Sequence, residues 1–397
     1  LAVAIGGFFI LLQNFYAPHE SVPKIKMLRG ATRIHILHVT DVRPRQFVAA
    51  ILSGMVMGAI LSGCSPVYVL RAAYEEGKIL WRREPIVEYV QKPEVTLDTQ
   101  EKLKLVLAVR EYARDALKLN VGGSYASYSY VDRPDLTHIV VAAPKTELRP
   151  YTWWFLIVGS VPYKGFFDKA DADEEARRLE AEGYDTNIRP SAAFSTLGWF
   201  DDPLLSHLLR YDKVVLSEII FHELFHQTLY VNGAGAFNES VANFIGHRAA
   251  VDFFRDRFGA DSAEHKRANL VWEEEREFGL FIAELAQTLT ELYNRDIARQ
   301  DKLRLREAVF TRGKTEWARH IADRPQHRAR AFSQQPLNNA VLMHYVVYLK
   351  DLDLFESVYE QSGRSLVKTI EMLKQAVESG GEPFDAVRRL LATKNAG

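Results

Sequence analysis

Two histidines four residues apart, with a glutamate between them, constrain this chain more than any other feature. They lie in residues 221–244, FHELFHQTLYVNGAGAFNESVANF. In an α-helix, residues i and i+4 project from the same face, so His222 and His226 can present two ring nitrogens to one zinc ion. Glu223 is rotated by about 100° from His222, too far to be a ligand but close enough to deprotonate a water molecule on the metal. The segment therefore predicts a zinc site with a general base.

A second helix can supply the third ligand that zinc needs. The glycine-rich stretch 232–235 can reverse the chain, so that Glu239 faces the two histidines from the next helix. His247, on the same helix, is the alternative. A metzincin pattern would need glycine at 229 and histidine at 232, but Leu229 and Asn232 stand there, which excludes that class. A helix with two surface histidines is the alternative to a metal site, but it does not account for a glutamate at this distance.

The composition is that of an ordinary globular protein. The chain has 397 residues, of which 47% are hydrophobic and 25% are charged, and its net charge is −1. This balance gives no reason to expect a nucleic-acid partner. Dinucleotide-binding and P-loop fingerprints are absent from the sequence, so no nucleotide cofactor is expected.

The single cysteine, Cys64, ends an apolar stretch. Residues 47–63, FVAAILSGMVMGAILSG, follow Arg43 and Arg45, which is the layout of an export signal. The ending LSGC resembles a bacterial lipobox, in which the cysteine is lipidated and anchors the protein to a membrane. The alternative is a transmembrane helix, since about 17 apolar residues are at the lower limit for a span.

Translation is expected to start at Met27, so residues 1–26 form an upstream extension. We assign 1–63 to this extension and the leader, and 64–397 to one folded domain. The expected location is the bacterial envelope, on the periplasmic side. Ser65 follows the cysteine instead of an aspartate, which leaves an outer-membrane destination open.

Strand-like segments come before helices in this domain. An amphipathic helix pattern within 65–97 is interrupted or ended by Pro85, and a helix is expected over 100–119. β-Branched and aromatic runs follow up to about residue 200, and helical periodicity dominates from 204 onward. Strands followed by helices predict an α+β fold, with a small mixed sheet in about 120–203 and a mostly helical, zinc-binding part in 204–397.

The segment NESVA, residues 238–242, resembles the NExxA-type segment of zinc aminopeptidases and thermolysin-like peptidases. In those enzymes the glutamate is the third zinc ligand, which implies that role for Glu239. Thermolysin-like enzymes have an aspartate four residues later that supports a histidine ligand. This chain has Asn243 at that position, and Glu218 is another candidate for the supporting role.

Other stretches resemble a predicted aminopeptidase family of bacterial lipoproteins. They are residues 63–86, 161–185 and 195–206, together with HELFHQTLYV and FNESVANFIG. The resemblance implies a zincin-like fold and a zinc-dependent, membrane-anchored peptidase of the gluzincin type, which acts on peptide substrates with one zinc ion per chain.

The same resemblance suggests where the substrate would lie. In gluzincins an edge strand before the HExxH helix pairs with the substrate backbone, and Ser195, Thr196, Leu197 and Gly198 are the expected strand. The alternative is an ordinary core strand.

The reaction also needs a donor for the oxyanion, and an exopeptidase needs a carboxylate for the free amine. Tyr345 is the expected donor and His344 the alternative, although most tyrosines are packing residues. For the amine, the sequence leaves Asp201, Asp202 and Glu218 open.

Two other functions fit the same metal site. One is a zinc endopeptidase or amidase that acts on envelope proteins or peptidoglycan. The other is a non-enzymatic lipoprotein that keeps zinc for stability. Glu223 argues against the second, since a structural zinc site has no use for a base.

Overall fold

The computed structural model describes residue 74 and residues 77–132, 137–155, 159–191 and 201–395. Cys64, Met27 and the expected substrate strand at 195–198 lie outside the described residues. No helix in these ranges is both apolar enough and long enough to span a bilayer.

The strands are β1 (Glu84–Pro85), β2 (Ser127–Ser129), β3 (Thr137–Pro144), β4 (Trp153–Phe155), β5 (Gly159–Val161), β6 (Lys164–Phe166), β7 (Tyr184–Ser191) and β8 (Leu204–Leu205). The helices are α4 (Ile86–Tyr89), α5 (Leu97–Asp115), α6 (Lys169–Ala181), α7 (Lys213–His226), α8 (Gly235–Phe258), α9 (Ala263–Asn294), α10 (Arg299–His320), α11 (Asn339–Leu349), α12 (Leu352–Gln361), α13 (Leu366–Glu378) and α14 (Pro383–Asn395), with short 3₁₀ helices η1 (Ser206–Arg210) and η2 (Arg328–Ser333).

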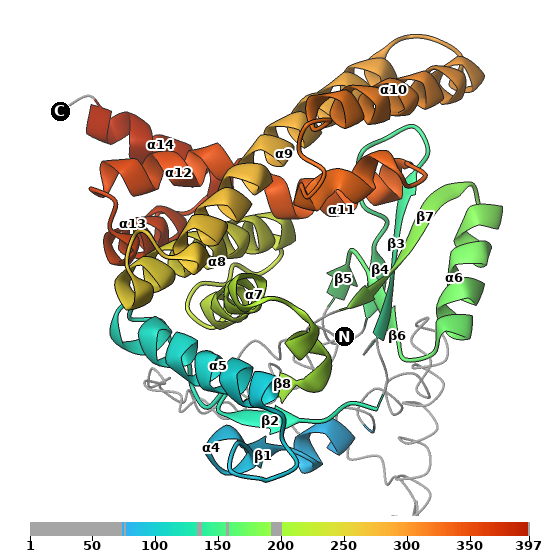
Figure 1. Ribbon diagram of the computed structural model, residues 1–397. Helices are drawn as coiled ribbons and strands as arrows, with labels where there is room; N and C mark the ends of the chain where they lie inside the picture. The colour runs from blue at the N-terminus through green and yellow to red at the C-terminus, as the bar shows by residue number, and fades with distance from the viewer. Residues whose placement is uncertain (1–73, 75–76, 133–136, 156–158, 192–200, 396–397) are drawn as a thin grey trace, which may run out of the picture.

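The fold is α+β, with the strands in the first half and the helices dominant after residue 205, as the sequence predicts (Figure 1). The strands form three small sheets, however, where the sequence predicted one. Their orders are β1-β2-β8, β6-β3-β7 and β4-β5. Alternating hydrophobicity predicts a strand but not its partner, because pairing depends on segments that are distant in the sequence.

The sheet β6-β3-β7 is antiparallel and carries α6 on one face (Figure 1). Ala172, Ala176 and Leu179 of α6, which recur at helical spacing, pack on Val140 and Ala142 of β3 in a small core of their own. β7 pairs with β3 along its whole length. Helix α11 packs against both β3 and β7, so that β7 lies beside the helical part of the molecule.

Helix α7 lies at the centre of the helical part, packed by α5, α8 and α9 (Figure 1). Leu216, Ile220, Phe221, Leu224 and Phe225 are all fully buried. A helix with apolar side chains on every face has to be enclosed by its neighbours. The HExxH segment is therefore a central element of the core and not a surface helix.

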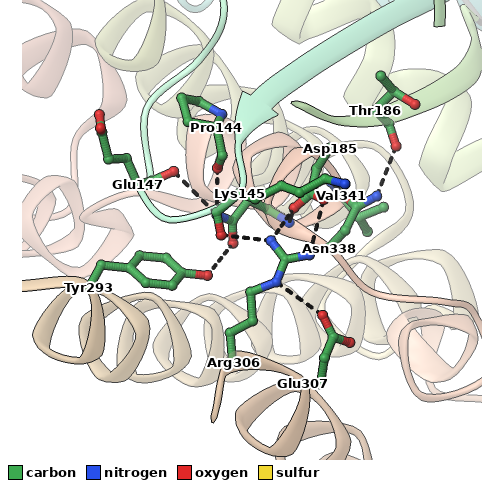
Figure 2. A network of polar contacts seen from close by, with 11 residues as sticks. Pro144, Lys145, Glu147, Asp185, Thr186, Tyr293, Arg306, Glu307, Asn338 and Val341 are labelled. Atoms are coloured by element: carbon green, nitrogen blue, oxygen red, sulfur yellow. Dashed lines mark hydrogen bonds and ion pairs between the residues drawn. The ribbon is translucent and has the colours of Figure 1, made fainter. Parts of the chain in front are cut away.

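A buried polar network fixes the sheet to the helices (Figure 2). Arg306 of α10 donates two hydrogen bonds to Asp185 of β7, at 2.6 and 3.0 Å, and one to the carbonyl of Lys145. Asn339, the first residue of α11, donates its backbone N–H to Asp185 and its side-chain amide to the carbonyl of Pro144. The network thus holds β7 and α11 in one arrangement.

Candidate metal centre

Three side chains that can bind a metal ion meet between α7 and α8. His222 Nε2 lies 3.1 Å from His226 Nε2 and 3.2 Å from Glu239 Oε2, and His226 Nε2 lies 3.7 Å from Glu239 Oε2. Ligand atoms that sit 2.0–2.1 Å from a tetrahedral zinc ion are about 3.3–3.4 Å apart. The three residues therefore fit one zinc ion. No other group of three potential metal ligands in the described ranges lies this close together.

The neighbours of Glu239 in the chain fix the position of the helix that carries it. Asn238 is buried, accepts a hydrogen bond from Val231 N at 2.9 Å and donates one to Val231 O at 2.8 Å. These bonds close the loop between α7 and α8. Ser240 donates to the carbonyl of Lys350, just after α11. The NES segment thus supplies a candidate ligand and two residues that orient it.

Gly246 allows α7 and α8 to approach each other at the site. A Cβ atom at this position would lie 2.8 Å from the carbonyl oxygen of Glu218 and 3.2 Å from Cβ of His222. The backbone of α7 cannot move away from such a contact cheaply, because α5 and α9 also pack against α7.

We expect Gly246→Ala to lower the free energy of unfolding by about 1–3 kcal/mol. Metal affinity should fall as well, because the substitution pushes Glu239 on α8 away from the histidines on α7. Urea denaturation and zinc titration measure the two effects. Gly235→Ala in the same helix is the matched control, because nothing lies within 4 Å of a Cβ at that position. Equal behaviour of the two variants would contradict the close approach.

The charges at the site suit a cation. Burial alone would raise the pKa of the Glu239 carboxyl, but the two imidazoles lower the pKa well below its usual range. Glu239 is therefore ionised, which is the state that ligates a metal. Burial raises the pKa of Glu223, and the nearby imidazoles oppose this rise. A carboxylate whose pKa is raised is better matched to proton transfer near neutral pH.

A cavity of about 430 Å³ opens beside the cluster, and it is lined by one of the three side chains, His222, and by Glu223. It extends between α7, α8, α9, η2 and α11, and the end of β7 completes its wall. Its lining combines apolar side chains, such as Phe278 and Phe332, with several charged groups. This mixture is typical of a site for a small ligand.

Helix α11 places His344 and Tyr345 on the wall of this cavity. Burial and then the charge of Arg189 lower the pKa of His344 to about 3, so its imidazole is neutral. The hydroxyl of Tyr345 accepts a hydrogen bond from Gln335 at 2.8 Å and keeps its own proton available to donate. The role of Tyr345 as oxyanion donor stays a prediction.

Two further residues on the cavity wall were missed by the sequence reasoning. Tyr348, one turn after His344, stacks on His222 with ring centroids 6.2 Å apart. The guanidinium of Arg189, from β7, lies 5.8 Å from the centre of the Tyr348 ring, and Arg189 Nε is buried without a hydrogen-bond partner in the described structure. Tyr348 could have been found from the sequence, because it lies one helical turn after His344, which was already a candidate. Arg189 gave none.

The two residues considered for support of the candidate ligand histidines have other partners. Asn243 donates to Tyr348 O at 3.2 Å and to Glu275 at 3.4 Å, and the carboxylate of Glu218 faces His247 at 3.1 Å. None of these contacts is made to His222 or His226. His247 is therefore a partner of Glu218 and is not part of the three-residue cluster.

Asp201 and Asp202, considered for the amine, come just before β8 and contact the turn at Gly123 and Ser124. Asp201 accepts a hydrogen bond from Gly123 N at 2.7 Å, and the backbone N–H of Asp202 donates one to Ser124 Oγ at 3.2 Å. Neither lines the cavity. Of the three carboxylates that the sequence left open, Glu218 alone does.

A family model described as "Putative aminopeptidase" matches residues 67–382, which include every residue of the cluster and of the cavity. No curated protein and no solved structure matches the chain.

Proposed function

Because the chain belongs to the Putative aminopeptidase family, we propose that it is a zinc-dependent aminopeptidase of the gluzincin type with a zincin-like fold. The observation that carries the proposal is the convergence of His222, His226 and Glu239 on one point, with Glu223 at the adjoining cavity. The proposal includes a lipid anchor at Cys64 and a location on the bacterial envelope, which rest on the sequence alone.

The three ligand side chains would hold zinc with one position left open. When bound, zinc supplies a Lewis acid that polarises a peptide carbonyl and makes water more acidic. Glu223 takes the proton from the attacking water and then passes it to the leaving amine. A peptide hydrolase needs this proton transfer, because the nitrogen would otherwise have to leave as a strongly basic amide anion.

The wall of the cavity supplies donors for the negative charge that develops on the carbonyl oxygen. Tyr345 is the donor expected from the sequence. Tyr348 and Arg189 join it as candidates, because Tyr348 stacks on His222 and Arg189 lies against the Tyr348 ring on the same cavity wall. Donors that are already fixed in place stabilise a developing oxyanion without reorganisation during the reaction. The apolar side chains around them exclude water.

Metal content tests the proposal directly. We expect about one zinc per chain by mass spectrometry in the purified protein, and much less in Glu239→Ala, because two imidazoles alone bind zinc weakly. His247→Gln is the matched control: it removes the competing candidate from the same helix and should keep its zinc. A parent protein without bound zinc would contradict the proposed function, and zinc lost only in His247→Gln would contradict the ligand set.

A further inference from the structure

We propose that Arg189 binds a carboxylate of the substrate, either the side chain of an acidic first residue or the C-terminus of a dipeptide. The inference rests on the proposed function and adds a substrate class to it. Arg189 belongs to β7 and lines the cavity that His222 and Glu223 also line. The planar fork of a guanidinium matches the two oxygens of a carboxylate, which is the anionic group that ordinary peptides carry.

The neighbours of β7 determine the direction in which Arg189 projects. Side chains four residues apart on a strand lie on the same face of the sheet, so Arg189 shares a face with Asp185. Asp185 accepts the backbone N–H of Asn339 at the start of α11. Ile188 lies on the opposite face, against the core under α6. Arg189 therefore projects toward α11, where its guanidinium lies against the ring of Tyr348.

The guanidinium of Arg189 has no counter-charge within the described part of the chain. No carboxylate there forms an ion pair with it, and its Nε is buried without a hydrogen-bond acceptor. Arg328, the other arginine on the cavity wall, lies 3.6 Å from Glu218 Oε2 and 3.4 Å from Glu275 Oε2. Arginine keeps its charge in proteins, and a buried donor without an acceptor is costly. A carboxylate of the substrate would supply both the acceptor and the counter-charge.

The guanidinium is close enough to the candidate metal ligands to meet a substrate near the scissile bond. The ring of Tyr348 stacks on that of His222, with centroids 6.2 Å apart, and the guanidinium of Arg189 lies 5.8 Å from the centre of the Tyr348 ring. This short separation suits a carboxylate that is a few bonds from the scissile carbonyl. The side chain of an acidic first residue and the C-terminus of a dipeptide both meet this condition.

The developing oxyanion is the alternative partner of Arg189, and the two partners predict different kinetics. An oxyanion donor acts on every substrate, because each develops the same charge, and its removal lowers kcat. A residue that binds a carboxylate acts only on substrates that carry the charge, and its removal mainly raises KM. A guanidinium without a counter-charge attracts an anion already in the ground state, which favours the carboxylate.

The first experiment compares two pairs of substrates that differ in one negative charge. One pair is the α-arylamides of glutamate and glutamine, and the other is alanylalanine and alanylalaninamide. The parent enzyme should cleave the charged member of at least one pair with a kcat/KM about 10- to 100-fold higher than that of the neutral member. A preference in the first pair identifies the side chain as the source of the carboxylate, and a preference in the second identifies the C-terminus.

Arg189→Gln should abolish this preference, so that the ratio of the two kcat/KM values approaches one, mainly through a higher KM for the charged substrate. Arg189→Lys keeps the charge but loses the planar fork, and it should retain part of the preference. Arg177→Gln is the matched control and should retain all of it, because Arg177 is exposed on α6 and does not line the cavity.

The second experiment measures binding without turnover, in zinc-loaded Glu223→Gln. Calorimetry should show that the charged member of the preferred pair binds at least about tenfold more tightly than its neutral partner. Addition of Arg189→Gln should remove this difference, and addition of Arg177→Gln should preserve it. The comparison of charged and neutral substrates in the parent enzyme still tests the inference if the Arg189 variants do not fold.

Three results would overturn the inference. They are the absence of a preference for the charged member of either pair in the parent enzyme, an undiminished preference in Arg189→Gln, and an equal loss for charged and neutral substrates in that variant, which would make Arg189 an oxyanion donor. In each case zinc binding and Glu223-dependent turnover would stand. Absence of zinc, with none of the four compounds cleaved, would instead contradict the proposed function and this inference with it.

Discussion

Glu223→Gln should abolish most of the peptidase activity while the protein keeps its zinc. Glutamine has the shape of glutamate but cannot take a proton from water, so kcat should fall by about 10²–10⁴-fold. The ligand atoms of His222, His226 and Glu239 are untouched by this change. The measurement is the rate of arylamide cleavage beside zinc content by mass spectrometry in the same preparation.

Two results would count against the assigned role of Glu223. An unchanged rate would show that another group moves the proton, and loss of zinc together with activity would show that the residue holds the site together instead. Glu273→Gln, which removes an exposed carboxylate on α9, is the matched control and should leave both readouts unchanged.

Arg306→Met should cause the largest loss of stability, about 3–5 kcal/mol. The side chains of Arg306 and Asp185 are only 8% and 5% exposed, and removal of the guanidinium leaves a buried carboxylate without its counter-charge. Urea denaturation followed by circular dichroism measures the change. The start of α11, which lines the cavity further along, should also become less well fixed, because Asp185 accepts the backbone N–H of Asn339.

Arg304→Met is the control for this experiment. Arg304 is an exposed arginine on the same helix, paired with Asp301 at 3.3 Å, and its loss should change stability by no more than about 0.5 kcal/mol. The double variant Arg306→Met/Asp185→Asn should be less destabilised than the single one, since no unpaired charge remains buried. Equal effects of Arg306→Met and Arg304→Met would contradict the structural role of the network.

The sequence alone predicted the three-residue cluster because its geometry is mostly local. Helical periodicity places His222, Glu223 and His226 relative to one another without any other part of the molecule. The prediction that Glu239 joins the cluster needed one more assumption, namely that the chain reverses over a short glycine-rich loop. The α+β order of strands and helices was equally readable, because hydrophobic periodicity is a local property of each segment.

Tertiary structure alone decided what surrounds the cluster. Arg189 and Glu275 come from segments far from the HExxH helix, and no spacing rule connects them to it. Gly246 has no signature in the sequence either, since its role is the distance between two helix backbones. The division of the strands into three sheets was likewise undetermined, because strand pairing is a choice among distant partners.

Glu218 shows most clearly what the sequence determines and what only the tertiary structure decides. Its position one helical turn before His222 follows from the sequence. This position suggested that Glu218 supports a histidine ligand or binds the free amine of a substrate. The packing of α8, α9 and η2 around α7 turned its carboxylate toward His247 and Arg328, at the end of a cavity. Local helix geometry fixes where a side chain starts, but the surface and charge that it meets depend on which distant segments burial brings against it.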